Sequence, residues 1–204
     1  MADFTRIRPA NDIAALELSS WCSGLLSQIS ECNHIVRHDL YASAATRIRV
    51  EEGLSGVRCV LFFGHGTETE LLGARYSALI DTLNIESASR AIVFAVACSS
   101  ASVLGTFAVS KGVECYLGFD GPLVWISRDP EDQFQPAATR GILRLIHGGT
   151  TGGALEEMTA AFGDVADYYL NGKGKGKSNS TIGWLAAFWN QKHLQLHGSG
   201  GATL

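Results

Sequence analysis

Val60-Leu61-Phe62-Phe63-Gly64-His65-Gly66 is one of two stretches that decide the fold of this 204-residue chain; the other is Ala91-Ile92-Val93-Phe94-Ala95-Val96-Ala97-Cys98-Ser99-Ser100. Both are short, continuous apolar runs rich in β-branched and aromatic residues. That pattern is typical of strands buried on both faces of a parallel sheet. In such sheets the functional crevice lies beyond the carboxyl ends of the strands. The sequence therefore predicts that His65 and Cys98 are delivered to one edge of a sheet.

Strands and helices are predicted to alternate around these two runs. Such alternation implies right-handed βαβ crossovers and an α/β, three-layer sandwich with a mostly parallel sheet. The predicted strands are 58–64, 91–97, 113–118 and 123–126, and the predicted helices between them are 77–85 and 101–110.

Helices are predicted on either side of this core. Asn11 is a suitable N-cap for a helix that begins near Asp12. A second helix is expected from 35 toward 49, with a short strand over 47–50 as the alternative. After the core, apolar residues recur at helical spacing in three further segments. These segments begin near Ala138, near Leu155 and at Thr181, and the last is expected to end near Leu196.

The composition suits one domain. The chain is 46% apolar and 18% charged, as in an ordinary globular protein with a sizeable core. We expect a single domain over residues 1–204, with an N-terminal helical part (1–55) and an α/β core (56–170). A flexible basic loop (171–180), in which glycine and lysine alternate, and a C-terminal helix and tail (181–204) complete it.

Composition and charge also exclude several classes of protein. A net charge of −4 argues against nucleic acid as a partner. No apolar run approaches the roughly 20 residues of a membrane span, and the first residues lack the apolar segment of a signal peptide. Five cysteines without a paired spacing are expected to be thiols in a reducing compartment. The expected location is cytoplasmic.

No cofactor or metal is expected. Cys32, His34 and His38 lie close in sequence, and His193 and His197 have the spacing of neighbours on one helix face. Neither group supplies the four ligands of a structural zinc site.

His65 and Cys98 are the residue types of a base and a nucleophile. A thiol attacks a carbonyl only as a thiolate, so it needs a base or a positive field nearby. The helix expected from 101 would favour that anion at its N-terminus. Gly64 and Gly66 permit a sharp turn at His65, and the amide beside the imidazole, with that of Cys98, suits an oxyanion hole. The alternative is a buried structural cysteine and an ordinary loop histidine.

At these residues the chain resembles the caspase-like (clan CD) cysteine peptidases, and most closely the branch of the bacterial CHAT proteins and the separases. The resemblance rests on Phe62–Gly66 and Phe94–Ser100, with Gly112–Gly118 similar to the next strand of that family. It implies a caspase-like fold in which a dyad cleaves peptide bonds through a thioester. It further implies that His65 is the base, Cys98 the nucleophile, and the Gly66 and Cys98 backbone amides the oxyanion donors.

Two features depart from the family pattern. Only 32 residues separate His65 from Cys98, so an intervening element is missing, and no acidic residue directly precedes Cys98. Asp120, just after the third strand, is a candidate pocket carboxylate for an Arg or Lys side chain of the substrate. Its alternative role is to cap the turn Phe119–Pro122.

The expected function is that of a cysteine endopeptidase acting on a protein or peptide substrate. A domain this small is expected to depend on an activating partner protein. Two alternatives remain open: a catalytically silent caspase-like scaffold or interaction subunit, and a small-molecule acyl-transfer or hydrolytic enzyme that uses the same dyad.

Overall fold

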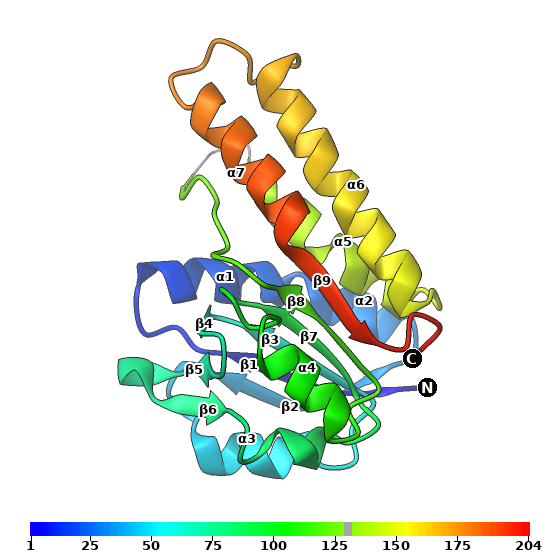
Figure 1. The fold of residues 1–204 in the computed structure, drawn as a ribbon. Coiled ribbons are helices and arrows are strands. Elements are labelled where there is room, and N and C mark those ends of the chain that lie inside the picture. The colour runs from blue at the N-terminus through cyan, green and yellow to red at the C-terminus, as the bar shows by residue number, and fades with distance from the viewer. Residues whose placement is uncertain (129–131) are drawn as a thin grey trace.

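A six-stranded sheet forms the centre of the molecule (Figure 1). The fold is described here from a computed structural model, which describes residues 1–128 and 132–204. The strands lie in the order β2-β1-β3-β7-β8-β9, and every neighbouring pair is parallel except β8 with β9, which is antiparallel. Their bounds are β1 (Asp3–Arg8), β2 (Ile35–Tyr41), β3 (Cys59–Phe63), β7 (Ile92–Val96), β8 (Cys115–Phe119) and β9 (Leu194–Gly198).

Helices cover both faces of this sheet. One apolar cluster joins it to α1, α2, α5, α6 and α7, and a second joins it to α3 and α4. In Figure 1, α6 and α7 form a hairpin that extends away from the sheet. The helices are α1 (Ile13–Ser23), α2 (Leu25–Glu31), α3 (Arg47–Leu54), α4 (Leu104–Ser110), α5 (Phe134–Ile146), α6 (Thr151–Leu170) and α7 (Ser180–His193).

The central strands are buried on both faces, as their apolar runs predict. In β3, Leu61 and Phe63 face the cluster of α1 and α5, whereas Val60 and Phe62 face that of α3 and α4. All four side chains are fully buried. The predicted three-layer α/β sandwich with a mostly parallel sheet is therefore confirmed.

The N-terminal part is not purely helical, contrary to the prediction for residues 1–55. It supplies two strands of the sheet, β1 and β2, and the helix expected from 35 toward 49 is β2 followed by α3. The alternative of a strand over 47–50 is also wrong, since those residues open α3. β2 is an edge strand whose residues are mostly exposed. Its sequence therefore lacks the apolar run that marks a central strand.

A buried arginine interrupts the apolar pattern by which β1 could be predicted from the sequence. Arg6 is only 1% exposed, and its Nη2 lies 3.1 Å from Asp39 Oδ2 on β2. Arg8 also binds Asp39, through its Nε at 2.7 Å from Oδ1. Burying a guanidinium costs free energy unless it is paired. The pairing of β1 with β2 therefore places the Asp39 carboxylate where it offsets the cost of burying Arg6.

Two further predictions, one between β3 and β7 and one after β8, are also wrong. Residues 77–85 do not form a helix but contain β6 (Ala78–Ile80), which pairs in a small antiparallel sheet with β5 (Leu71–Leu72) and then β4 (His65–Gly66). Residues 123–126 form no strand. Short 3-10 turns complete the chain: η1 (Ala42–Ala44), η2 (Ala74–Tyr76) and η3 (Ile85–Ala88).

The C-terminal helix ends earlier than expected. It stops at His193, and the chain continues as β9, which pairs with β8 from Cys115↔Gly198 to Phe119↔Leu194. Residues 171–179 form a series of turns between α6 and α7, and Ser180 already opens α7. The flexibility expected for 171–180 remains a prediction. None of the helices in the described ranges is long and apolar enough to cross a membrane.

Close packing of α5 on α6 allows a stability test. A Cβ added at Gly141 would lie 2.8 Å from the Ala154 carbonyl oxygen and from Met158 Sδ. Gly141→Ala is therefore expected to lower the free energy of unfolding by about 1–3 kcal/mol through overpacking, although alanine is the better helix former. Urea unfolding followed by circular dichroism measures this change.

Gly24→Ala is the matched control. Nothing lies within 4 Å of a Cβ at Gly24, and its φ of −64° suits alanine. This variant is expected to raise the free energy of unfolding by about 0.4–1 kcal/mol, because alanine restricts the unfolded chain. A Gly141→Ala protein as stable as the wild type would contradict the close approach.

Candidate active site

The two predicted catalytic residues follow neighbouring parallel strands. Phe63 of β3 pairs with Val96 of β7, and His65 and Cys98 each come two residues later. The Gly64 amide also donates to the Val96 carbonyl oxygen at 3.2 Å. Both side chains therefore leave the sheet at the same edge.

Gly66 brings the His-Gly turn against the Cys98 backbone. A Cβ at Gly66 would lie 2.7 Å from the Cys98 carbonyl oxygen and 3.5 Å from the Cys98 amide nitrogen. No side chain fits at that separation, so the close approach requires glycine. The two backbone segments that carry the predicted oxyanion donors are thus in contact.

His65 has a carboxylate partner that the sequence did not reveal. Its Nε2 lies 2.7 Å from Oδ2 of Asp12, and its ring centroid lies 5.5 Å from that of Tyr76. When Nε2 carries the proton and donates it to Asp12, the neutral ring presents a lone pair at Nδ1. Asp12 thus orients the imidazole, as the third member of a catalytic triad does.

Asp12 is itself fixed by the start of α1. Its Oδ1 accepts a hydrogen bond of 2.8 Å from the Ala15 amide, so Asp12, rather than Asn11, is the N-cap. Burial alone would raise the pKa of Asp12, but hydrogen bonds from Ala15 and from His65 outweigh burial and lower it. Asp12 is therefore ionised at neutral pH. The only local signal in the sequence was that of a helix start, which says nothing of a histidine 53 residues away.

Cys98 lies in a strained turn between β7 and α4. Its side chain is partly exposed, and its Sγ accepts a hydrogen bond of 3.3 Å from the Leu123 amide. A donor at the sulfur stabilises negative charge there. The next residue, Ser99, has a φ of 53°, a left-handed conformation that favours glycine, and its amide donates to the Gly121 carbonyl oxygen at 2.8 Å.

One expected source of thiolate stabilisation is missing. The helix predicted from 101 begins at Leu104, and it has only seven residues. The field of a helix terminus falls off within its first turn. The dipole of α4 therefore does not act on Cys98, and the Leu123 amide is the donor observed at its sulfur.

The other cysteines differ from Cys98 in their surroundings. Burial raises the pKa of Cys22 to about 12 and that of Cys115 to about 11, and it raises the pKa of Cys59 as well. Cys32 is partly exposed, and its Sγ lies 3.4 Å from Nδ1 of His147. Cys32 is thus the second thiol that a labelling experiment must resolve.

Asp120 ties the end of β8 to the C-terminal segment. Its Oδ1 lies 2.6 Å from His193 Nδ1, and its Oδ2 accepts a hydrogen bond of 2.8 Å from Gln195 Nε2. Its amide donates to the His193 carbonyl oxygen at 2.9 Å. Both carboxylate oxygens therefore already have partners within the chain, and neither partner belongs to the turn that the alternative interpretation had Asp120 capping.

Histidine spacing does not create a metal site. His197 lies in β9 rather than on the helix of His193, and its Nε2 is 2.7 Å from the Ala101 carbonyl oxygen. Within residues 1–128 and 132–204, no group of three or more His, Cys, Asp or Glu side chains is placed to hold a metal ion.

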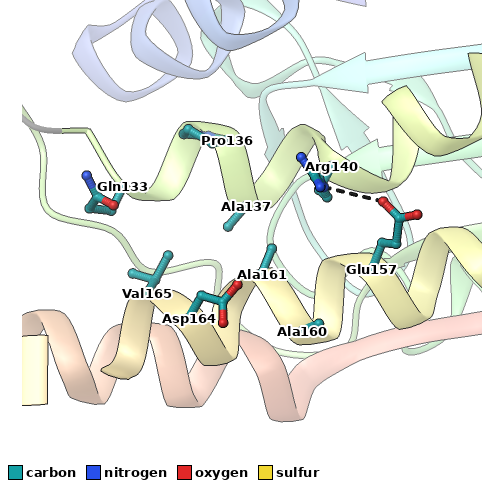
Figure 2. Close-up of a pocket in the computed structure, with 9 residues that line it drawn as sticks. All are labelled: Gln133, Pro136, Ala137, Arg140, Glu157, Ala160, Ala161, Asp164 and Val165. Atoms are coloured by element: carbon teal, nitrogen blue, oxygen red, sulfur yellow. Dashed lines mark ion pairs between the residues drawn. The ribbon is translucent and has the colours of Figure 1, made fainter. Parts of the chain in front are cut away.

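A groove of about 350 Å³ lies between α5 and α6, away from these residues (Figure 2). An ion pair between Arg140 Nε and Glu157 Oε2, at 3.3 Å, spans it. Neither His65, Cys98 nor Asp120 lines this groove. It carries none of the chemistry that the sequence predicts.

Comparison with known proteins shows the fold. No known protein-family model matches the sequence, and no curated protein matches it. Among solved structures, the chain is similar to one described as the complex of Porphyromonas gingivalis RgpB pro- and mature domains. The TM-score is 0.60 at 13% sequence identity, and the match covers 97% of this chain and 46% of the other. The chain thus spans less than half of the protein that it resembles, which shares its fold.

The contact between Asp12 and His65 leads to a testable prediction. Asp12→Asn is expected to slow alkylation of Cys98 by iodoacetamide about tenfold or more, because an amide cannot stabilise the protonated imidazole. Mass spectrometry of the Cys98 peptide measures the rate, with the Cys32 peptide as an internal reference.

Folding stability separates the two roles of Asp12. Asparagine caps helices as well as aspartate does, so Asp12→Asn should change the free energy of unfolding by less than about 0.5 kcal/mol, whereas Asp12→Ala should lower it by about 1 kcal/mol. Wild-type alkylation kinetics in Asp12→Asn would show that Asp12 serves only as the helix cap.

Proposed function

We propose that this chain is a cysteine endopeptidase that cleaves a protein or peptide substrate in the cytoplasm, and that it belongs to the CHAT and separase branch of the caspase-like peptidases. One observation carries the proposal. In a caspase-like sheet, neighbouring strands deliver His65, with its carboxylate partner Asp12, and the partly exposed thiol of Cys98 to the same edge. A base held by a carboxylate beside a nucleophile is the arrangement that acyl transfer requires.

The proposed reaction has two acyl-transfer steps. His65 Nδ1 takes the proton of the Cys98 thiol, and the thiolate attacks the carbonyl carbon of the scissile peptide bond. The tetrahedral oxyanion accepts hydrogen bonds from the Gly66 and Cys98 amides. As the C–N bond breaks, the leaving amine takes the proton from His65 and a thioester remains. His65 then deprotonates a water molecule, whose attack releases the acid and restores the thiol.

Leu123 and Asp12 assist the residues that react. The Leu123 amide at 3.3 Å from the sulfur stabilises the thiolate before attack. The carboxylate of Asp12 stabilises the imidazolium that exists between the two proton transfers. Both hydrogen bonds are stronger to the charged intermediates than to the neutral resting groups, and catalysis depends on that difference.

Alkylation and peptide cleavage test the proposal together. We expect the wild type to hydrolyse members of a peptide library and to be alkylated at Cys98 by a peptidyl chloromethyl ketone. Cys98→Ala should abolish both reactions, and His65→Ala should slow both by about 100-fold or more, because general-base catalysis is lost. Circular dichroism of both variants should match that of the wild type.

A catalytically silent scaffold is the rival function. It is favoured by the short connection between β3 and β7, which holds a small sheet and the turn η3 instead of an α-helix. A scaffold would leave Cys98 no more reactive than Cys32 toward the peptidyl electrophile, and His65→Ala would then change nothing. An activating partner protein belongs to the peptidase proposal, and peptidase activity that appears only in a cell extract would support its existence.

Cleavage after Arg or Lys is a finer proposal that depends on Asp120. A substrate cation would have to replace His193 and Gln195 at the carboxylate. We expect Asp120→Ala to lower the free energy of unfolding by about 1–3 kcal/mol, because it leaves two polar partners unsatisfied. Thermal unfolding and a peptide screen measure the two effects. Selective loss of cleavage after Arg and Lys, with unchanged stability, would assign Asp120 to the substrate instead.

A further inference from the structure

An exposed apolar groove of about 330 Å³ lies between α7 and the segment that follows β8. We call it the α7 groove. Four large apolar side chains of α7 line it, and each is substantially exposed, from 41% for Trp189 to 61% for Ile182. Such a cluster of exposed apolar side chains is unusual on a protein surface. It is lined by Val124, Ile182, Leu185, Ala186, Phe188 and Trp189.

One lining residue of this groove, Val124, is next in the chain to the residue that binds Cys98. The Leu123 amide, which donates to Cys98 Sγ, directly precedes Val124 in the chain. The side chain of Asn190 on α7 is fully buried and binds both backbone groups of Val124: its Oδ1 accepts from the Val124 amide at 3.0 Å, and its Nδ2 donates to the Val124 carbonyl oxygen at 2.6 Å. Trp189 Nε1 donates to the Pro122 carbonyl oxygen at 2.8 Å. The groove therefore has a fixed position relative to the thiol.

These contacts limit the distance from the thiol to the groove. Because the Leu123 amide lies 3.3 Å from the sulfur and successive Cα atoms are about 3.8 Å apart, the Cα of Val124 lies within about 9 Å of Sγ. An extended peptide advances about 3.3 Å per residue. A substrate whose scissile carbonyl is at Cys98 thus reaches the groove with its second or third residue from the cleaved bond.

We propose that the α7 groove is a subsite that binds a bulky apolar side chain of the peptide substrate, two or three residues from the scissile bond. This inference rests on the proposed peptidase function. The occupant follows from the lining, which is aliphatic and aromatic and contains no titratable side chain. Such a lining stabilises an apolar side chain by removing it from water and offers a charged one no partner.

Trp189 also connects the subsite to Asp120, through His193. Its ring centroid lies 3.9 Å from that of His193, which in turn binds Asp120. The α7 side of the groove, the hydrogen bonds of Asp120 and the Leu123 donor are therefore joined by one set of contacts between α7 and the segment after β8. An apolar side chain bound at Trp189 would be held by the same structure that fixes the sulfur.

The experiment uses internally quenched peptides and matched surface variants. From one cleaved sequence, a series moves a single Leu or Phe through each position from the third before to the third after the scissile bond, with Ala elsewhere. Ile182→Glu and Leu185→Glu place a carboxylate in the groove. Ile48→Glu is the matched control, because Ile48 is also helical and is 70% exposed on α3.

We expect one position, the second or third from the scissile bond, at which the apolar residue raises kcat/KM about tenfold. Ile182→Glu and Leu185→Glu should each remove that preference, whereas Ile48→Glu should keep it. Alkylation of Cys98 by iodoacetamide should proceed at the wild-type rate in all three variants, since this small reagent does not use the groove.

Other outcomes would overturn the inference. Cleavage without any preference for an apolar residue, or a preference that survives in both groove variants, would reject the subsite and leave the peptidase function standing. A wild-type protein that cleaves no peptide and whose Cys98 reacts no faster with a peptidyl chloromethyl ketone than with iodoacetamide would reject both. Binding of a second copy to the groove, seen as a dimer that Ile182→Glu dissociates, would assign the surface to self-association instead.

Discussion

The parallel pairing of β3 with β7 is the constraint on which the candidate site depends. Both strands are buried on both faces, and a slip of one residue would exchange the side chains that pack against the two helical layers. The register is therefore fixed at Phe63↔Val96. Because His65 and Cys98 each follow that pair by two residues, the packing of the core sets the level at which the candidate base and the candidate nucleophile leave the sheet.

Polar contacts then fix the orientation of the two side chains that the sheet positions, His65 and Cys98. The base is oriented by Asp12, whose carboxylate is fixed by capping α1. The thiol is held by the Leu123 amide, and the next residue, Val124, is bound at its amide and its carbonyl oxygen by Asn190 of α7. Each candidate side chain thus lies beyond a strand of the central sheet and is held by a residue that a helix fixes, an arrangement that limits the reorganisation needed during a reaction.

The α7 hairpin links the site to the far edge of the sheet. Its C-terminal residue, His193, binds Asp120 at the end of β8, and the chain then turns into β9, which pairs with β8. Removing α7 would therefore release both the edge strand and the segment beside the thiol. The protein depends on its C-terminal segment for stability and, under the proposed function, for catalysis and for the choice of substrate as well.

The sequence by itself determined the elements whose own residues show, by their apolar pattern, that they are buried. Strands β3, β7 and β8 are apolar throughout, and α5 and α6 carry apolar stripes. The position of His65 and Cys98 just beyond two neighbouring strands follows from the same apolar runs. Only the tertiary structure decided the remaining elements. β1, β2, β6 and β9 owe their extended form to neighbouring strands or to a distant ion partner, so their local sequences resemble helices or loops. The same holds for Asp12, Leu123 and the partners of Asp120, because a hydrogen bond between residues far apart in the chain leaves no pattern in the sequence around either one.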